Sequence, residues 1–281
     1  MKETSRKVAI LCVVAASLLW STGGLLIKMV DWNPIAIAGI RSGISSVVML
    51  IFWYMLTKRL PKRLDKTALF AAVNYMVLVM LFVSANKLTT SANAILLQFT
   101  APAWAIVIGG AFFNEKFVKK DYITVFVVFL GMVLFFLGDL GGGKTIGNII
   151  AIISGISMAM MIILLKRVKN HKPLEVVFWG NLLTFIIAIP FYGTITFTQS
   201  NILGILLLGV FQLGISYIFF TKGIQNVSVL EGILIPVLEP LLNPVWVLIG
   251  TGEMPSQYAL IGGAIVLVAV IFHSLSEVKR T

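Results

Sequence analysis

Glu239 is an acidic residue in the middle of a long apolar stretch that also contains Pro236, Pro240 and Pro244. Proline has no backbone N–H group, so these three residues weaken the hydrogen-bond ladder of a helix and leave carbonyl groups free beside the acid. A carboxylate at such a break is suited to bind an amine group or to take up and release a proton. The alternative is a structural acid that is protonated or hydrogen-bonded to a neighbouring helix.

A belt of hydrogen-bonding and aromatic residues is expected at the depth of Glu239. Measured from the ends of their apolar stretches at about 1.5 Å per residue, the following residues fall near the middle: Trp20, Ser21, Asn74, Tyr75, Gln98, Ser157 and Gln212. Together they suit a small polar metabolite with an apolar part, although each one alone is equally explained by a bond between helices. Arg41 also lies inside an apolar stretch, where we expect it to pair with an acid or to extend outward.

Ten apolar stretches of membrane-spanning length must position these residues. The chain has 281 residues and is 59% hydrophobic, whereas one span needs only about 20 apolar residues. Backbone polar groups in a bilayer must be satisfied internally, and the period-two alternation of a membrane barrel is absent, so we predict an all-α integral membrane protein. The predicted spans are residues 8–29, 34–56, 67–87, 91–113, 121–138, 146–167, 173–193, 201–222, 229–251 and 257–276.

Lys and Arg residues are concentrated in alternate loops. Eighteen of the 22 basic residues lie on one side of the predicted membrane, while the other side has only Lys28, Lys87 and Lys144, and Arg41 lies inside a span. The positive-inside rule therefore predicts a multi-pass protein of the cell inner or plasma membrane with both termini in the cytoplasm. The net charge of +11 follows from this topology, and it suits contact with membrane lipid rather than nucleic acid. The eighteen residues are Lys2, Arg6, Lys7, Lys58, Arg59, Lys62, Arg63, Lys66, Lys116, Lys119, Lys120, Lys166, Arg167, Lys169, Lys172, Lys222, Lys279 and Arg280.

The two halves of the chain repeat each other. A shift of 138 residues places Pro102 on Pro240 and Glu115 on Glu253, with a Pro-to-Glu spacing of 13 residues in each half. Because five is odd, a second five-helix repeat enters the membrane from the opposite side, an inverted arrangement typical of secondary transporters. Chance matches between apolar segments are the alternative. The predicted repeats, within one integrated membrane domain, are residues 1–140 and 141–281.

Two related motifs, one in each half, accompany a shorter pattern near the beginning of the chain. They are Gln98-Phe99-Thr100-Ala101-Pro102 through Asn114-Glu115, Leu238-Glu239-Pro240 through Gly252-Glu253, and Leu19-Trp20-Ser21 with Lys28, Pro34 and Arg41. They resemble the signatures of the EamA family in the drug/metabolite transporter superfamily. The resemblance implies ten helices in two inverted units, a central cavity, and export or uptake of a small metabolite. Ala101 stands where the second half has Glu239, so a role of that acid cannot be duplicated.

These features predict a secondary active transporter rather than an enzyme. We expect alternating access and, on the resemblance, export of an amino acid or a related amphipathic compound. Uptake of a cationic nutrient and drug efflux are alternatives within transport, and a membrane-embedded lipid-modifying enzyme is the alternative from another class. The sequence leaves open whether the protein forms a homodimer. A structural or gating role is predicted for Arg41, Pro102 and Pro240, a coupling role for Glu239, and substrate contacts for Trp20, Asn74, Tyr75, Gln98, Ser157, Gln212 and Glu239.

Three other patterns are interpreted as carrying no chemistry. Gly138 to Thr145 match the phosphate-binding pattern G-x-x-x-x-G-K-[ST], but they join two predicted spans and lack the preceding strand that nucleotide binding requires. His171 and His273 are near the cytoplasmic side without a cysteine cluster, so neither a metal nor a cofactor is expected. The basic residues before Val8 also permit interpretation as a cleaved signal peptide, although no convincing small-residue cleavage site closes that run.

Overall fold

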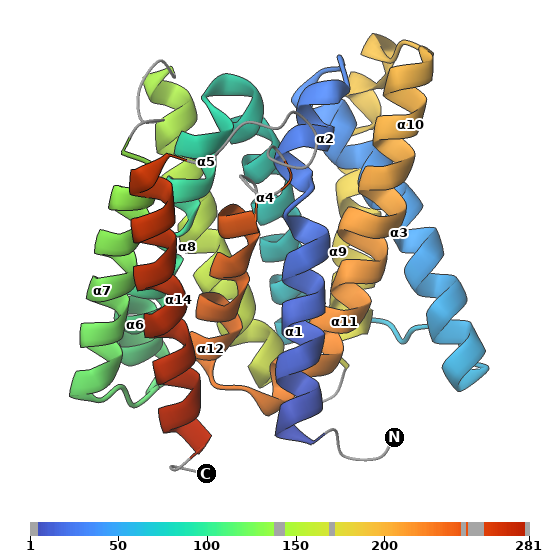
Figure 1. The fold of residues 1–281 in the computed structure, drawn as a ribbon. Coiled ribbons are helices and arrows are strands. Elements are labelled where there is room, and N and C mark those ends of the chain that lie inside the picture. The colour runs from blue at the N-terminus through green and yellow to red at the C-terminus, as the bar shows by residue number, and fades with distance from the viewer. Residues whose placement is uncertain (1–4, 138–143, 169–171, 243–245, 247–255, 279–281) are drawn as a thin grey trace.

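The computed structural model describes residues 5–137, 144–168, 172–242, 246 and 256–278. Within these ranges every regular element is a helix and no strand occurs. Figure 1 shows a bundle in which the start of α1 (Arg6–Trp20) and the end of α14 (Gln257–Val278) lie at the same end. A guanidinium N–H of Arg6 donates to the Ser274 carbonyl at 3.3 Å, so the two helices meet there. We call this end, where most of the described Lys and Arg side chains gather, the basic end.

The helices of the first half follow the predicted apolar stretches, and local sequence fixes where they begin and end. The side chain of Asn33 accepts a hydrogen bond from the Ile35 N–H at 2.9 Å before the first turn of α3, where Pro34 adds no unpaired N–H group. Lys58 and Asn114 end α3 and α6 in the left-handed region, at φ values of 54° and 52°. The remaining helices are α2 (Gly23–Met29), α3 (Pro34–Thr57), α4 (Lys66–Leu88), α5 (Ser91–Gln98), α6 (Ala101–Phe113) and α7 (Lys119–Phe135).

The second half contains more changes of helix type. Ser228 and Glu231 form a reciprocal capping box at the start of α12, with the Ser228 N–H donating to the Glu231 carboxylate at 2.8 Å. Residues 238–242 are helical and follow η4 directly. The elements before α14 are α8 (Thr145–Arg167), α9 (Pro173–Ile187), η1 (Ile189–Thr194), α10 (Gln199–Leu207), the π-helical η2 (Leu208–Ile215), α11 (Ser216–Gly223), η3 (Ile224–Asn226), α12 (Val229–Leu234) and η4 (Ile235–Val237).

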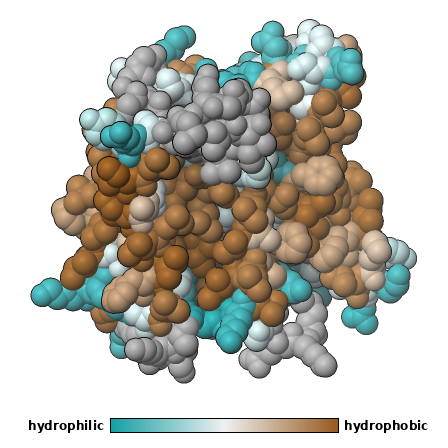
Figure 2. Space-filling model, viewed as in Figure 1, coloured by the Kyte–Doolittle hydropathy of each residue, from teal (hydrophilic) through white to brown (hydrophobic). Residues whose placement is uncertain are grey.

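The surface of the bundle carries a hydrophobic belt between two polar ends (Figure 2). This belt is the expected signature of a chain whose solvent is the bilayer. Seven helical segments in the described residues are long and apolar enough to cross a membrane: Arg6–Met29, Pro34–Thr57, Lys66–Leu88, Asn93–Phe113, Thr145–Arg167, Gln199–Asn226 and Gln257–Ser276. The described parts of the other three predicted stretches contain the shorter helices α7, α9 and α12.

Helices from the two halves pack against each other throughout the bundle. α1 lies against α11, α3 against α9 and η2, and α4 against α8 and α9. α7 and α14 form a close pair at one edge (Figure 1), where a Cβ on Gly262 would lie 2.4 Å from the Phe135 nitrogen. Glycine there lets the two backbones approach each other, as small residues do in membrane bundles.

Four segments change helix type inside the bundle. α1 gives way to α2 at Ser21–Thr22, α5 to α6 at Phe99–Thr100, and α10 to α11 through the π-helical η2. The predicted interruption near Glu239 is confirmed as the 3-10 turn η4, which contains Pro236 and immediately precedes residues 238–242. Pro244, the third proline of that prediction, lies outside the described residues. Irregular backbone at membrane depth occurs where it is buried in protein or lines a cavity, so these breaks mark the region of interest.

Candidate functional site

A narrow cavity lies at the centre of the bundle, where the four breaks converge. Its volume is about 50 Å³, which is room for a few water molecules, so the described conformation is contracted around the site. One or more side chains must therefore move before a metabolite can enter. The lining residues are Trp20, Arg41, Leu78, Val79, Phe82, Gln98, Met158, Met161, Gln212, Leu213, Tyr217, Phe220 and Glu239.

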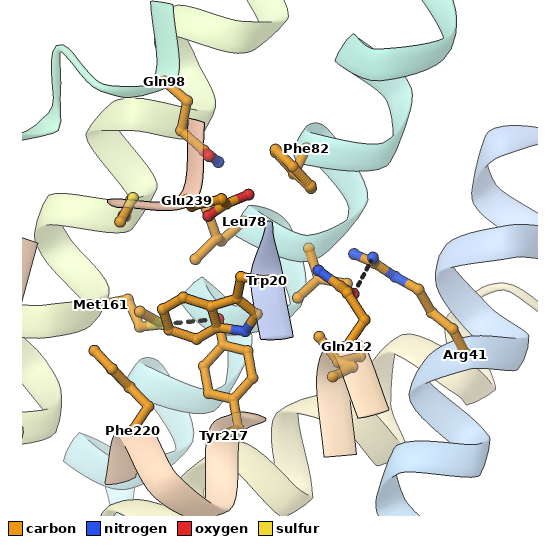
Figure 3. A pocket seen from close by; sticks show the side chains of 13 residues that line it. Trp20, Arg41, Leu78, Phe82, Gln98, Met161, Gln212, Tyr217, Phe220 and Glu239 are labelled. Carbon is orange, nitrogen blue, oxygen red and sulfur yellow. Dashed lines mark hydrogen bonds between the residues drawn. The ribbon is translucent and has the colours of Figure 1, made fainter. Parts of the chain in front are cut away.

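Glu239 and Arg41 face the cavity from opposite sides (Figure 3). Glu239 is 8% exposed and has no hydrogen bond or ion pair with another described residue. Arg41, on α3, is 1% exposed, and the two charges attract each other across the space between them. A buried ionisable side chain is costly unless it has a partner, so an acid and a base that face one cavity without an ion pair mark it as the candidate site.

Gln212 holds one edge of the Arg41 guanidinium. The Arg41 Nη1 group donates to the Gln212 Oε1 atom at 3.1 Å, whereas Arg41 Nε has no partner in the described residues. Gln212 belongs to η2, and π-helical turns of this kind are frequent at functional sites. A Cβ on Gly23 would lie 2.8 Å from the Gln212 Nε2 atom, so the glycine at the α1–α2 break leaves the amide the space it occupies.

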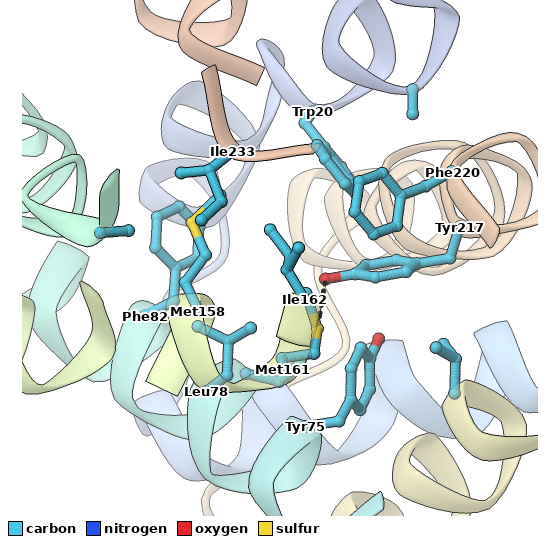
Figure 4. Close-up of a cluster of buried hydrophobic side chains, with 14 of the residues drawn as sticks. Trp20, Tyr75, Leu78, Phe82, Met158, Met161, Ile162, Tyr217, Phe220 and Ile233 are labelled. Atoms are coloured by element: carbon cyan, nitrogen blue, oxygen red, sulfur yellow. Dashed lines mark hydrogen bonds between the residues drawn. The ribbon is translucent and has the colours of Figure 1, made fainter. Parts of the chain in front are cut away.

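Trp20 supplies a second unpaired donor and part of an aromatic wall. Its indole Nε1 atom is buried without a partner among the described residues. The ring packs on Tyr217 and Phe220, with centroid distances of 5.0 Å to each, and Tyr75 contacts Tyr217 edge-on at 5.0 Å (Figure 4). Tyr217 and Phe220 lie between Gln212 and the end of α11, so this cluster closes the cavity towards the basic end.

Five of the predicted site residues meet at the cavity. Trp20, Gln98, Gln212 and Glu239 line it, each from one of the four breaks, and Arg41 lines it from the regular helix α3. The prediction that Arg41 pairs with an acid or extends outward was wrong. Arg41 is buried, forms no ion pair with a described acid, and donates instead to the Gln212 amide oxygen.

Three other predicted residues lie outside the lining and connect helices instead. The Asn74 Nδ2 atom donates to the Ser157 carbonyl at 2.9 Å, which ties α4 to α8. Tyr75 lies behind Tyr217 and accepts from the Asn181 Nδ2 atom at 3.0 Å, which ties α4 to α9. The sequence left two interpretations open for these residues, contact with substrate or a bond between helices. In the structure they lie where they bond one helix to another.

Two of the predicted structural prolines have different surroundings. Pro240 is buried beside Glu239, whereas Pro102, in the first turn of α6, lines a separate apolar groove between α6 and α7. Sequence reasoning missed the apolar lining, of which Tyr217 and Phe220 close one side. Their three-residue spacing, one turn beyond Gln212, was the only available signal for them.

No group of three His, Cys, Asp or Glu residues that could hold a metal occurs in the described part of the chain. Cys12 is buried and free. His171, Glu253 and most of the stretch from Gly138 to Thr145 lie outside the described residues, as does the predicted boundary between the repeats at residue 140.

Comparison with known proteins gives a family match over nearly the whole chain. The EamA-like transporter family matches residues 7–137 and, a second time, residues 145–275. The chain belongs to the EamA-like transporter family. It is therefore a multi-pass membrane protein that is surrounded by lipid and transports a small molecule. The family indicates transport rather than enzymatic activity.

Relatives of this EamA-like chain carry the same general description. An uncharacterized transporter of Archaeoglobus fulgidus is 26% identical over 260 residues, covering 92% of this chain and 93% of that protein. The uncharacterized transporter YdfC of Bacillus subtilis is 24% identical, covering 98% and 94% of the two chains. A solved crystal structure superposes with a TM-score of 0.80 over 98% of this chain and 99% of the other, at 19% identity, which supports the fold alone.

Proposed function

We propose that this protein is a secondary active transporter that exports an amino acid, or a related small zwitterion, by alternating access. The observation that carries the proposal is the pair of opposite buried charges, Glu239 and Arg41, which face one cavity without an ion pair between them. A zwitterion satisfies both charges at once. A simple amine would leave Arg41 without a negatively charged partner. A simple carboxylate would leave Glu239 without a positively charged one.

In this proposal each end of the substrate has a defined partner. The ammonium group binds the Glu239 carboxylate, and the carboxylate binds Arg41 and the free indole N–H of Trp20, because both donors are buried without a full set of acceptors. The substrate side chain then lies against the apolar part of the lining, such as Phe82 and Met158. Charge-assisted bonds fix orientation, and the apolar contacts select the side chain.

The proposed topology has ten spans in two inverted repeats, in a cell inner membrane, with the basic end in the cytoplasm. The two successive family matches, residues 7–137 and 145–275, support two related halves. The distribution of Lys and Arg supports the orientation. Export rests on the family resemblance.

Alternating access requires the basic end to open and close. Several ion pairs and packing contacts at this end are suited to hold it closed. Glu231, at the start of α12, forms an ion pair with Arg6 of α1. Arg167, at the end of α8, pairs with Glu115 at 2.7 Å. Behind these ties lies the aromatic cluster around Tyr217. We infer that the described conformation is closed on the cytoplasmic side, and that substrate entry from the cytoplasm breaks these contacts.

Proton coupling through Glu239 completes the proposal. Glu239 has no counterpart at the matching position of the first half, where the chain has Ala101, so a single carboxylate would alternate between substrate and proton. The prediction is that the pH dependence of transport disappears together with substrate binding when this acid is replaced.

The proposal is tested by thermal unfolding of the purified protein with three matched probes: leucine, 3-methylbutylamine and 4-methylpentanoate. A ligand that binds only the native state raises the unfolding temperature in a saturable manner. We expect leucine alone to do so, and the shift to disappear in Glu239→Gln but to persist in Asp31→Asn, at an exposed acid outside the cavity. An equal shift with the amine would favour the alternative, a carrier of cationic nutrients or drugs.

A further inference from the structure

A second hollow lies on the outer surface of the bundle, between α6 and α7. Its volume is about 410 Å³, and it is far wider than the central cavity. Nearly all of its walls are apolar, and several of the side chains are largely exposed on the membrane-facing surface, among them Phe126 at 62% and Val107 at 56%. The lining residues are Phe99, Thr100, Pro102, Ala103, Ile106, Val107, Tyr122, Val125, Phe126, Val128 and Phe129.

The groove continues along both helices towards the basic end. On α6 the lining positions Ala103, Ile106 and Val107 lead to Gly110, where an added Cβ would meet no atom within 4 Å. On α7 the position three residues before Tyr122 is Lys119, which is exposed and lies on the same helix face. The groove therefore runs from the α5–α6 break to a basic residue at the polar end of the bundle.

At the basic end of the groove, which we call its mouth, the acidic side chains have bonding partners, whereas positive charges are exposed. Glu115 is paired with Arg167, and Asp121 is bonded to His273 at 3.2 Å. Lys119, the first residue of α7, and Lys116, in the segment between α6 and α7, are both exposed. The combination of a long apolar channel and an uncompensated cationic mouth matches a molecule with an apolar tail and an anionic head.

We propose that this groove binds an anionic phospholipid, with one acyl chain between α6 and α7 and the phosphate at Lys119. The bilayer supplies this ligand at the height of the groove, and lysine residues at the membrane surface attract anionic headgroups. The absence of a side chain at Gly110 and the small methyl group of Ala103 provide the width for the acyl chain. The site is separate from the central cavity, and its existence does not depend on which solute the protein carries.

The test is native mass spectrometry of the delipidated protein with phosphatidylglycerol and phosphatidylethanolamine of identical chains. We expect one tightly retained phosphatidylglycerol, and at least a threefold lower retained fraction with phosphatidylethanolamine. Lys119→Gln should remove this preference, while Lys66→Gln should preserve it, because Lys66 is the exposed first residue of α4 and so occupies the same position in its helix.

A second variant tests the acyl-chain part of the site. Gly110→Leu fills the groove without a clash, and it should lower retention at least threefold, whereas Gly193→Leu, at another glycine with no atom within 4 Å, should leave it unchanged. Equal retention of both lipids by the native protein, or unchanged retention in Gly110→Leu, would overturn the proposal. Displacement of the lipid by millimolar inorganic phosphate would also overturn it, since the headgroup alone would then account for binding.

Discussion

The central cavity and the α6–α7 groove are neighbours with opposite chemistry. Gln98 lines the cavity, and the next residue, Phe99, lines the groove, because the chain turns between α5 and α6 at this point. The cavity is narrow and holds two buried charges, while the groove is wide, apolar and open to the bilayer. Polar groups at membrane depth face protein rather than lipid. In the proposed function the smaller hollow is the solute site, so the volume of a hollow does not identify it.

The largest expected effect comes from removing the acid of the cavity. Glu239→Gln keeps the shape of the side chain but loses the charge. We expect amino acid transport to fall at least about tenfold, because the free energy of one charge-assisted hydrogen bond corresponds to a factor of about that size in binding. The measurement is uptake of labelled substrate into proteoliposomes. Asp31→Asn, at an exposed acid between α2 and α3, is the control and should retain activity within twofold. Undiminished transport and pH dependence in Glu239→Gln would refute both binding and coupling by this residue.

Replacing the cation of the cavity should change what is recognised. Arg41→Gln removes the partner of the substrate carboxylate, so we expect leucine binding to weaken about tenfold while 3-methylbutylamine binding strengthens. Thermal-shift titrations of both probes measure the change. Weaker leucine binding without any gain in 3-methylbutylamine binding would mean that Arg41 supports the fold of the site rather than the carboxylate.

A smaller effect is expected from moving the Gln212 amide. In Gly23→Ala the new methyl group would lie 2.8 Å from the Gln212 Nε2 atom, which is the end of a flexible side chain and can move aside. We expect KM for the substrate to rise about threefold with little change in the unfolding temperature. Gly24→Ala is a matched control, since its nearest contact is an ordinary 3.6 Å to Ser91 Cβ. Equal KM values for the two variants would show that the amide position is unimportant.

The smallest effect on transport is expected from a replacement that lies outside both the central cavity and the α6–α7 groove. Asp121→Asn keeps the shape of the residue that bonds to the Val118 N–H and to His273, so we expect a loss of stability of about 1 kcal/mol and an unchanged KM. Thermal unfolding and transport kinetics measure the two quantities separately. An altered KM would mean that the edge pair α7–α14 takes part in the transport cycle.

The sequence predicted the segments well because hydrophobic length and helix-capping residues are local signals. Asn33 with Pro34 starts α3 where expected, and the prolines around Glu239 indicated the break that η4 provides. The π-helical turn around Gln212 was not predictable, since it depends on packing between η2 and α3. The cavity-facing direction of Tyr217 and the position of Asn74 between α4 and α8 depend on how each helix rotates about its axis. A single apolar sequence contains little information on that rotation, since lipid and protein core favour the same side chains.

The bond between Asp121 and His273 has a consequence for how the molecule is made. Both side chains are almost fully buried, and 152 residues separate them. During synthesis α7 is therefore made long before α14, and the Asp121 side chain has no His273 to bond to until the last helix has been made. Asp121 lies within the first of the two family matches and His273 within the second, so this buried bond forms only when both halves have been made.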